Sequence, residues 1–277
     1  MNSLYNAIGI SKQAVTQYAK RQALFDNQIQ ELIVEADILK QGHPGCGVEK
    51  MYDTLKPEFI GRDRFISTFM DLGYRVKRQK NYRRTTYSGS LYYPNLIKGL
   101  EINEPSAIWQ TDITYIRLKD KFYYAVFIID VYTKNIVGYS ISNHMRVEAN
   151  LSALKMAFKK HKPPKIHHSD RGSQYTSKVY LSLLRENNCE ISMGLIAQDN
   201  AYAERINRTI KEEYLSYWKA ENFQQLKNQV KKAVSNYNMK RNHRHLPKMN
   251  PVVFEKYWKT LKEKDKPKIT IFNNEII

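Results

Sequence analysis

The sequence predicts an α/β protein in which a mixed five-stranded sheet with flanking helices follows a set of all-α units. Before residue 86, apolar residues recur at helical spacing and no strand pattern occurs. From Pro105 onward, short segments rich in β-branched and aromatic residues alternate with amphipathic helices. We therefore expect a helical N-terminal region and a separate sheet-containing core.

The first helical unit is expected over residues 1–22 as a short helix-turn-helix. Gly9 supplies its turn, and Ser11 is placed to cap the helix that follows. Lys12 lies on the exposed face of that second helix, which is short and basic. This composition suits contact with a DNA groove, although a helical hairpin without DNA contact is the alternative.

A second helix-turn-helix domain is expected over residues 23–85. Three amphipathic helices alternate with breaks, and Arg62 and Arg64 open the third, where a recognition helix meets DNA. The domain ends in an acid-free basic arm with interleaved tyrosines, which is typical of a segment that follows phosphates. The basic residues of the arm are Arg75, Lys77, Arg78, Lys80, Arg83 and Arg84.

The remaining chain divides into a linker, a catalytic core and a tail. Residues 86–104 are turn-rich, residues 105–220 carry the strands, and residues 221–277 form a helical C-terminal region. The second strand pattern, KFYYAVFIIDVYT, is almost continuously apolar, so this strand should be central and covered on both faces. The expected order β-β-β-α-β-α-β-α matches the ribonuclease-H-like fold.

Charge is the strongest bulk property of the chain. The 45 Lys and Arg against 27 Asp and Glu give a net charge of +18 and a pI near 9.6, which favours a polyanionic partner such as double-stranded DNA. The sequence has no long apolar run, so no membrane partner is expected and the protein should be cytoplasmic. Its two cysteines form no CxxC pair.

Three acidic residues lie at positions where burying a carboxylate costs free energy. Asp112 lies in the strand WQTDITYI, Asp170 ends the strand of HHSDRGSQYTS, and Glu204 opens a helix in DNAYAERIN. In the ribonuclease-H-like order the first and fourth strands are neighbours, so the two aspartates meet and the helix brings the glutamate over them. Such a cluster suits two Mg²⁺ ions, for which Mn²⁺ can substitute, and metal-assisted phosphoryl transfer.

The helix of Glu204 also carries basic residues. Positions 204, 208 and 211 share a helical face, so Arg208 and Lys211 should lie beside the metal site, with Arg205 nearby. We expect all three to contact DNA, a solvated basic face being the alternative. Asp199 is interpreted as the N-cap of this helix.

Several blocks in order resemble one family: WQTDITYI, HHSDRGSQYTS, DNAYAERINRTIKEEY and the tail YNMKRNHRHLPKMNP. The chain resembles the second-frame (OrfB-type) protein of the insertion-sequence-three family of bacterial transposases, which are related to retroviral integrases. The resemblance implies a DDE-type transposase with Asp112, Asp170 and Glu204 as catalytic, metal-binding acids. It also implies cleavage at the inverted-repeat ends of a mobile element, 3′-OH strand transfer into target DNA, and assembly as a homo-oligomer on DNA.

The resemblance has one departure and leaves alternatives open. The 33 residues between Asp170 and Glu204 are slightly fewer than in the family form. The family's active enzyme is often a frameshift fusion with a first-frame protein, so this chain alone could be a non-catalytic DNA-binding regulator. A ribonuclease-H-type nuclease is a further alternative. Rival sites are Asp130 as a metal ligand, His167 and His168 as zinc ligands, and an H-x-H nuclease motif at His243 and His245.

Overall fold

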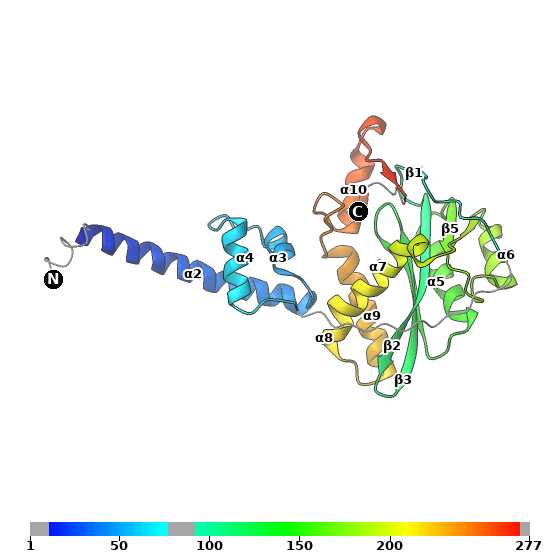
Figure 1. The fold of residues 1–277 in the computed structure, drawn as a ribbon, viewed down its shortest axis with the longest axis horizontal. Helices are drawn as coiled ribbons and strands as arrows, with labels where there is room; N and C mark the ends of the chain where they lie inside the picture. Colours follow the sequence, from blue (N-terminus) through cyan, green and yellow to red (C-terminus); the bar gives the residue numbers. More distant parts are fainter. Residues whose placement is uncertain (1–10, 77–91, 272–277) are drawn as a thin grey trace. The chain divides into compact units, whose positions relative to one another are not determined.

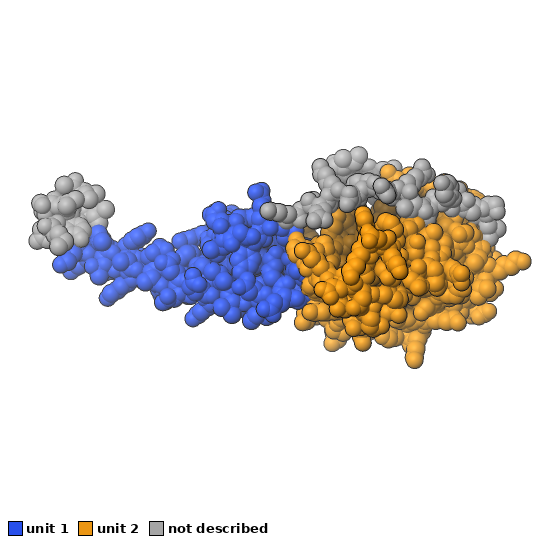
Figure 2. Space-filling model, turned by 90° about the horizontal axis from the view of Figure 1, so that it is seen from below, with its two compact units in different colours: residues 1–77 blue, residues 78–277 orange. Residues whose placement is uncertain are grey.

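A computed structural model of the chain describes residues 11–76 and 92–271. The chain divides into two compact units, residues 1–77 and 78–277, which are described separately below (Figure 2). The proposed turn at Gly9 lies outside the described residues. The same holds for most of the basic arm, namely Lys77, Arg78, Lys80, Arg83 and Arg84.

The described part of the first unit is a three-helix arrangement of α2 (Lys12–Gly42), α3 (Val48–Leu55) and α4 (Arg62–Asp71). Its core is built from residues at helical spacing on each helix, because that spacing puts them on one face. The side chains of Phe65 and Phe69 stack with ring centroids 4.2 Å apart. Both rings are fully buried with Ala36 and Met51.

Helix α2 crosses the boundary that the sequence suggested between residues 22 and 23. The helix begins where predicted, because Ser11 Oγ accepts a hydrogen bond from the backbone N–H of Ala14 at 3.1 Å. It then continues without a break to Gly42, so residues 12–22 are the first turns of one 31-residue helix. No strong breaker stands between residues 12 and 41, which explains why the helix does not stop.

The second unit is built on a five-stranded mixed sheet (Figure 1). Its strands are β2 (Ile108–Leu118), β3 (Lys121–Asp130), β4 (Ile136–Ser142), β5 (Ile166–Ser169) and β6 (Glu190–Met193). They lie in the order β4-β3-β2-β5-β6, in which β3 pairs antiparallel with both β2 and β4, whereas β5 pairs parallel with both β2 and β6. The predicted ribonuclease-H-like arrangement is confirmed, including the pairing of the first and fourth predicted strands.

Helices cover both faces of this sheet, as the apolar run of β3 predicted. Val126 and Ile128 point to a face packed by α5 (Val147–Lys160) and α6 (Lys178–Glu186). Phe127 and Ile129 point to the opposite face, packed by α7 (Ala201–Ile210) and α9 (Phe223–Met239). Successive residues of a strand point to opposite faces, so a strand that is apolar throughout needs a helical layer on each side.

Helix α5 approaches β4 at a glycine. A Cβ atom on Gly138 would collide with the backbone oxygen of Ala153 and would lie 2.9 Å from the Cβ of Ala157. Both alanines are fully buried. The absence of a side chain at residue 138 therefore allows the close contact between helix and sheet.

The C-terminal region belongs to the same core. Helix α7 continues into η2 (Lys211–Leu215), a π-helical turn, and α8 (Ser216–Trp218). Leu226, Val230 and Tyr237 of α9 are buried in the cluster that also contains Phe127. The region beyond residue 220 is therefore packed against the sheet-containing core.

The last described segment of the chain returns to the beginning of the second unit. Helix α10 (Pro251–Thr260) is followed by a short helical turn, η3 (Glu263–Asp265). Strand β7 (Ile269–Thr270) then pairs antiparallel with β1 (Glu101–Ile102). Residues 269–271 thus return to the start of the described core.

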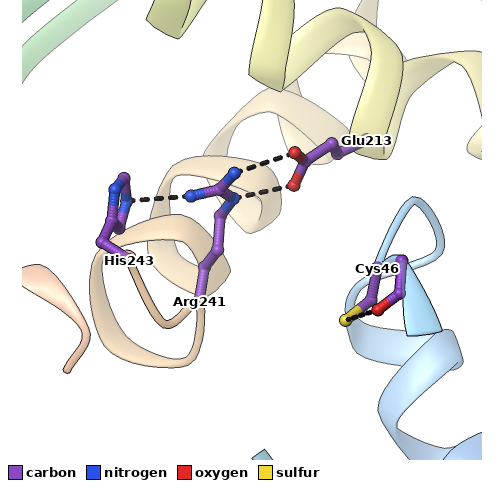
Figure 3. Close-up of polar contacts among 5 residues, drawn as sticks. Cys46, Glu213, Arg241 and His243 are labelled. Atoms are coloured by element: carbon purple, nitrogen blue, oxygen red, sulfur yellow. Dashed lines mark hydrogen bonds and ion pairs between the residues drawn. The ribbon is translucent and has the colours of Figure 1, made fainter. Parts of the chain in front are cut away.

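An ion pair joins the tail after α9 to the π turn (Figure 3). The guanidinium of Arg241 donates to both carboxylate oxygens of Glu213 at 2.7 and 2.8 Å, and to Nε2 of His243 at 3.0 Å. The Arg241 side chain is only 5% exposed, so this pair is desolvated. Such a bidentate contact fixes the π turn against the end of α9.

Candidate active site

The two aspartates lie at one level of the sheet. Strand β5 runs parallel to β2, and the last paired residues next to the site are Gln110 and His168. Asp112 and Asp170 each follow two residues later, in β2 and directly after β5. Neighbouring strands are about 4.8 Å apart, so equal spacing from a paired position brings both carboxylates to the same edge of the site. Glu204 lies in the first turn of α7.

The electrostatics of these acids show that they are mutual neighbours. Burial, followed by repulsion from Asp170 and Glu204, raises the pKa of Asp112 to about 8. Burial also raises the pKa of Asp170, and burial with repulsion from Asp170 raises that of Glu204. A cation placed among the three carboxylates would offset this repulsion.

Protein donors already engage part of the aspartate pair. Asp112 Oδ1 accepts from the backbone N–H of Ile113 at 2.8 Å, and Oδ2 accepts from Nδ2 of Asn207 at 2.7 Å. Asp170 Oδ1 accepts from the N–H of Gly172 at 3.0 Å. These bonds hold the carboxylates in place but leave lone pairs on each oxygen, because a carboxylate oxygen can accept more than one bond.

The donor set suits a divalent cation in its chemistry and charge. Three carboxylates are the ligands that Mg²⁺ prefers. Within residues 11–76 and 92–271, however, no three His, Cys, Asp or Glu side chains are grouped closely enough to hold a metal ion as they stand. The side chain of Glu204 is half-buried.

Asp199 does not cap the helix of Glu204, contrary to the sequence interpretation. Its Oδ2 accepts instead from the N–H groups of Leu195 and Ile196, at 2.8 and 3.3 Å, within the preceding turn η1 (Ala197–Asn200) and its approach. The N-cap position belongs to Asn200, whose side-chain amide donates to the carbonyl oxygen of Thr111 at 2.9 Å. The short side chain of residue 199 closes the loop before the helix begins.

Two polar residues at the site were not found from the sequence. Gln110 is fully buried, and its Oε1 accepts from the N–H groups of Tyr202 and Ala203 at 3.2 and 3.3 Å. Asn207 is buried beside Asp112. Two patterns could have revealed them: Gln110 lies two residues before Asp112 on the same strand face, and Asn207 lies three residues after Glu204 on the same helix face.

The three basic residues that were predicted to lie beside the acids differ in their exposure to solvent. Arg205 and Arg208 are exposed, and Lys211 is half-buried. Burial lowers the pKa of Lys211, and the Asp112 carboxylate partly offsets that effect, so the ammonium lies near the acid. The positive charge of Arg208 acts in the same way on Glu204, where it opposes the effect of burial. The predicted shared face of positions 204, 208 and 211 is thus consistent with these electrostatic couplings.

The predicted DNA contacts of the first unit have mixed surroundings. Lys12 and Arg75 are exposed. Arg62 forms ion pairs with Glu49 at 3.4 Å and Asp63 at 3.1 Å. The guanidinium of Arg64 lies 4.0 Å from the centroid of the Phe25 ring. All four remain predicted DNA contacts. Arg62 and Arg64, which open α4, also contact other side chains of their own unit.

The rival acid, Asp130, has a structural role. Its Oδ1 accepts from the N–H groups of Tyr132 and Thr133, both at 2.9 Å, and its Oδ2 accepts from that of Ser106. These contacts close the turn after β3.

The histidines considered as zinc ligands also make structural contacts. His167 Nε2 bonds the hydroxyl of Tyr180 at 3.1 Å, and His168 Nδ1 bonds that of Ser192 at 2.8 Å. Both rings are buried, and burial lowers the pKa of His167 to about 3 and that of His168 to about 4. They pack β5 against its neighbours as neutral rings. His243 contacts Arg241, as described above.

Comparisons with known proteins place this geometry in a family. The integrase core domain family matches residues 102–197, and a second integrase core domain family matches residues 188–251. The chain is 33% identical over 207 residues to the "Insertion element IS600 uncharacterized 31 kDa protein" of Shigella sonnei, covering 72% of this chain and 76% of that protein. It is 36% identical over 191 residues to the "Transposase for insertion sequence element IS904" of Lactococcus lactis subsp. lactis (strain IL1403), covering 67% of this chain and 74% of that protein.

Solved structures give a more distant likeness. The catalytic core domain of HTLV-2 integrase, in complex with magnesium in a trimeric form, matches with a TM-score of 0.47 and 18% identity. The match covers 58% of this chain and 99% of that one. Among the described residues, no helix of the chain is long and apolar enough to cross a membrane.

Proposed function

Because this chain belongs to the insertion-sequence-three family of bacterial transposases, as a second-frame (OrfB-type) protein, we propose that Asp112, Asp170 and Glu204 are its catalytic acids. The chain is a DNA transposase, and its family supports polynucleotidyl transfer. The observation that supports these three residues best is the shared level of the two aspartates on β2 and β5, together with the repulsion among all three acids.

The chemistry proposed is cleavage at the element ends followed by strand transfer from the new 3′-OH. The three acids would hold two Mg²⁺ ions, or Mn²⁺ in their place, which when bound activate the attacking hydroxyl and stabilise the leaving oxygen. The chain's own residues prepare the acids for this role. Asn207 and the N–H of Ile113 orient the Asp112 carboxylate, and the N–H of Gly172 orients Asp170.

Basic residues on the helix of Glu204 would place the DNA. Lys211 lies near Asp112, so its ammonium can contact a phosphate that approaches the acids. The exposed Arg205 and Arg208 would contact the strand further from the reacting bond. A fixed cation near the acids both orients the scissile phosphate and offsets its charge.

The helical first unit would supply most of the binding to the inverted-repeat ends. Its exposed Lys12 and Arg75, the start of α4 and the basic arm would contact DNA as a helix-turn-helix domain does. The net charge of +18 supports a salt-dependent phosphate component of that binding. The active form is proposed to be a homo-oligomer on DNA in the bacterial cytoplasm, with a first-frame protein as fusion or partner.

The decisive experiment compares Glu204→Gln with the matched control Glu212→Gln. Residue 212 is an exposed acid on the same helical segment, so both variants remove one negative charge. In an assay with element ends and Mg²⁺, we expect Glu204→Gln to lose cleavage and joining while it binds the ends like the wild type. Glu212→Gln should keep all three activities.

The outcomes separate the alternatives. End joining by Glu204→Gln at near the wild-type rate would remove Glu204 from the site. A wild-type protein that binds ends but never cleaves them would identify a DNA-binding regulator. Cleavage confined to the RNA strand of a hybrid would identify a ribonuclease-H-type nuclease.

A further inference from the structure

The first turn of α7, which carries Glu204, has no side-chain cap from its own chain segment. The leading N–H groups of a helix have no partner within the helix, and the N-cap side chain normally accepts from one of them. In α7 the N-cap is Asn200, and its side chain is directed to Thr111 of β2 instead. The N–H of Ala201 donates to the carbonyl oxygen of Gln198 in η1, and the N–H groups that follow need another acceptor.

Gln110 provides that cap from the neighbouring strand. Its Oε1 accepts from Tyr202 and Ala203, at 3.2 and 3.3 Å, and its Nε2 donates to the carbonyl oxygen of Asp199 at 3.3 Å. The side chain is completely buried, so no water replaces these bonds when they are lost. The side-chain amide of Gln110 thus joins the η1 turn to the first turn of α7.

The spacing of the two elements gives this cap a geometric effect. Gln110 and Asp112 lie on the same face of β2, two residues or about 6.8 Å apart. Their partners on α7 are Ala203 and Asn207, four residues or about 6 Å apart along the helix axis. The two contacts therefore join strand and helix at matched intervals, and Glu204 follows directly after the residue that the glutamine binds.

We infer that Gln110 is a positioning residue that sets the register of α7 on β2 and so places Glu204 opposite Asp112. It touches no reacting atom and acts through the helix. The inference rests on the proposed role of Glu204 as a metal-binding acid. Without the cap, α7 keeps its apolar contacts and the bonds of Asn200 and Asn207 to β2, but its first turn loses its own polar contact with the strand.

The test uses Gln110→Met, which keeps the volume and removes the hydrogen bonds, with Asn238→Leu as the matched control. The half-buried Asn238 likewise bonds main-chain groups with its amide elsewhere: it accepts from the N–H and donates to the carbonyl oxygen of Ile136, at 3.0 and 2.9 Å. Both full-length variants should lose thermal stability to a similar extent. Hydrogen exchange at residues 202 and 203 should accelerate only in Gln110→Met.

Metal dependence gives the second readout. The Mg²⁺ concentration for half-maximal end cleavage, and the Mn²⁺ affinity measured by electron paramagnetic resonance, should weaken about 10-fold or more in Gln110→Met, the effect typical of residues that orient a metal ligand. Asn238→Leu should stay near the wild-type values, and binding to DNA ends should be unchanged in both. Gln110→Glu keeps the acceptor, so exchange at residues 202 and 203 should remain slow, which tests the cap if the methionine variant fails to fold.

Two results would overturn the inference. One is a Gln110→Met protein with wild-type exchange at residues 202 and 203. The other is an equal change of Mg²⁺ and Mn²⁺ dependence in Gln110→Met and Asn238→Leu. Failure of the proposed function would be recognised separately, because Glu204→Gln would then cleave ends like the wild type, whatever the exchange data show.

Discussion

Asp112 is expected to make the metal-free protein less stable as pH rises. The pKa of its carboxyl is about 8 in the folded chain against an ordinary value of 3.8. Between these values the folded state holds a proton that the unfolded state has lost, so the free energy of unfolding falls as pH increases through the window. Asp112→Asn cannot lose a proton, so the variant should become more stable than the wild type as pH rises from 4 to 8.

The magnitude follows from the size of the shift. Each pKa unit corresponds to about 1.36 kcal/mol, so the full difference sets an upper limit of about 6 kcal/mol at pH 8. Burial is the largest cause of the shift, and its effect is smaller at the effective dielectric near 20 of real protein sites, so we expect a gain of about 1–3 kcal/mol. A domain of this size gains about 2–4 °C in Tm for each kcal/mol.

Thermal unfolding in a chelator at pH 4.5, 6 and 8 measures the effect. The wild type and Asp112→Asn should differ little at pH 4.5, and the variant should melt at a progressively higher temperature toward pH 8. Excess Mg²⁺ should stabilise the wild type and leave the variant almost unchanged, because only the wild type retains the ligand set. A variant that melts no higher than the wild type at pH 8 would refute the reasoning, as would a gap that is constant with pH.

Three further changes test other parts of the second unit. Lys211→Ala should lower strand transfer at least about tenfold, or ~1.4 kcal/mol, with little change in end binding; an unchanged transfer rate would contradict the proposed phosphate contact. Arg241→Ala should lower the free energy of unfolding by about 3–5 kcal/mol, because it leaves the Glu213 carboxylate without its partner. Adding Glu213→Gln should restore part of that loss. Denaturant titration of the single and double variants measures both effects. Gly138→Ala should lower Tm by several degrees, because its Cβ would collide with Ala153; calorimetry showing a wild-type Tm would mean that α5 can shift at no cost.

The sheet and the acids could be predicted because their patterns are local. An apolar run as long as that of β3 has few alternatives to a central strand, and a carboxylate such as Asp112 inside an apolar strand stands out by its desolvation cost. Together they indicated the fold, the paired strands and the three acids. The acids remain proposed ligands until the variants are measured.

The missed features depend on partners distant in sequence. Gln110 looks like any polar strand residue until α7 supplies the N–H groups that it accepts from. Asp199 was misassigned because a short acid before a helix usually caps it, whereas the compact η1 turn takes this carboxylate for its own N–H groups. The continuity of α2 past residue 22 was missed because an expected domain boundary outweighed good helix propensity.

The π turn η2 changes what insertions and deletions do in this part of the chain. It holds Lys211–Leu215 between two α-helical stretches, and a π turn contains about one residue more than an α turn. Deleting one residue there would allow a regular α-helix and would leave the residues beyond it facing nearly as before, because five residues of a π turn cover about the same rotation as four residues of an α-helix. Winding all five residues as a regular α-helix would instead turn every later residue by about 90°, so Trp218 would leave the buried cluster that it packs against. The π turn therefore keeps Ile206 and Ile210 before it, and Tyr214 and Leu215 within it, in one buried cluster despite the extra residue.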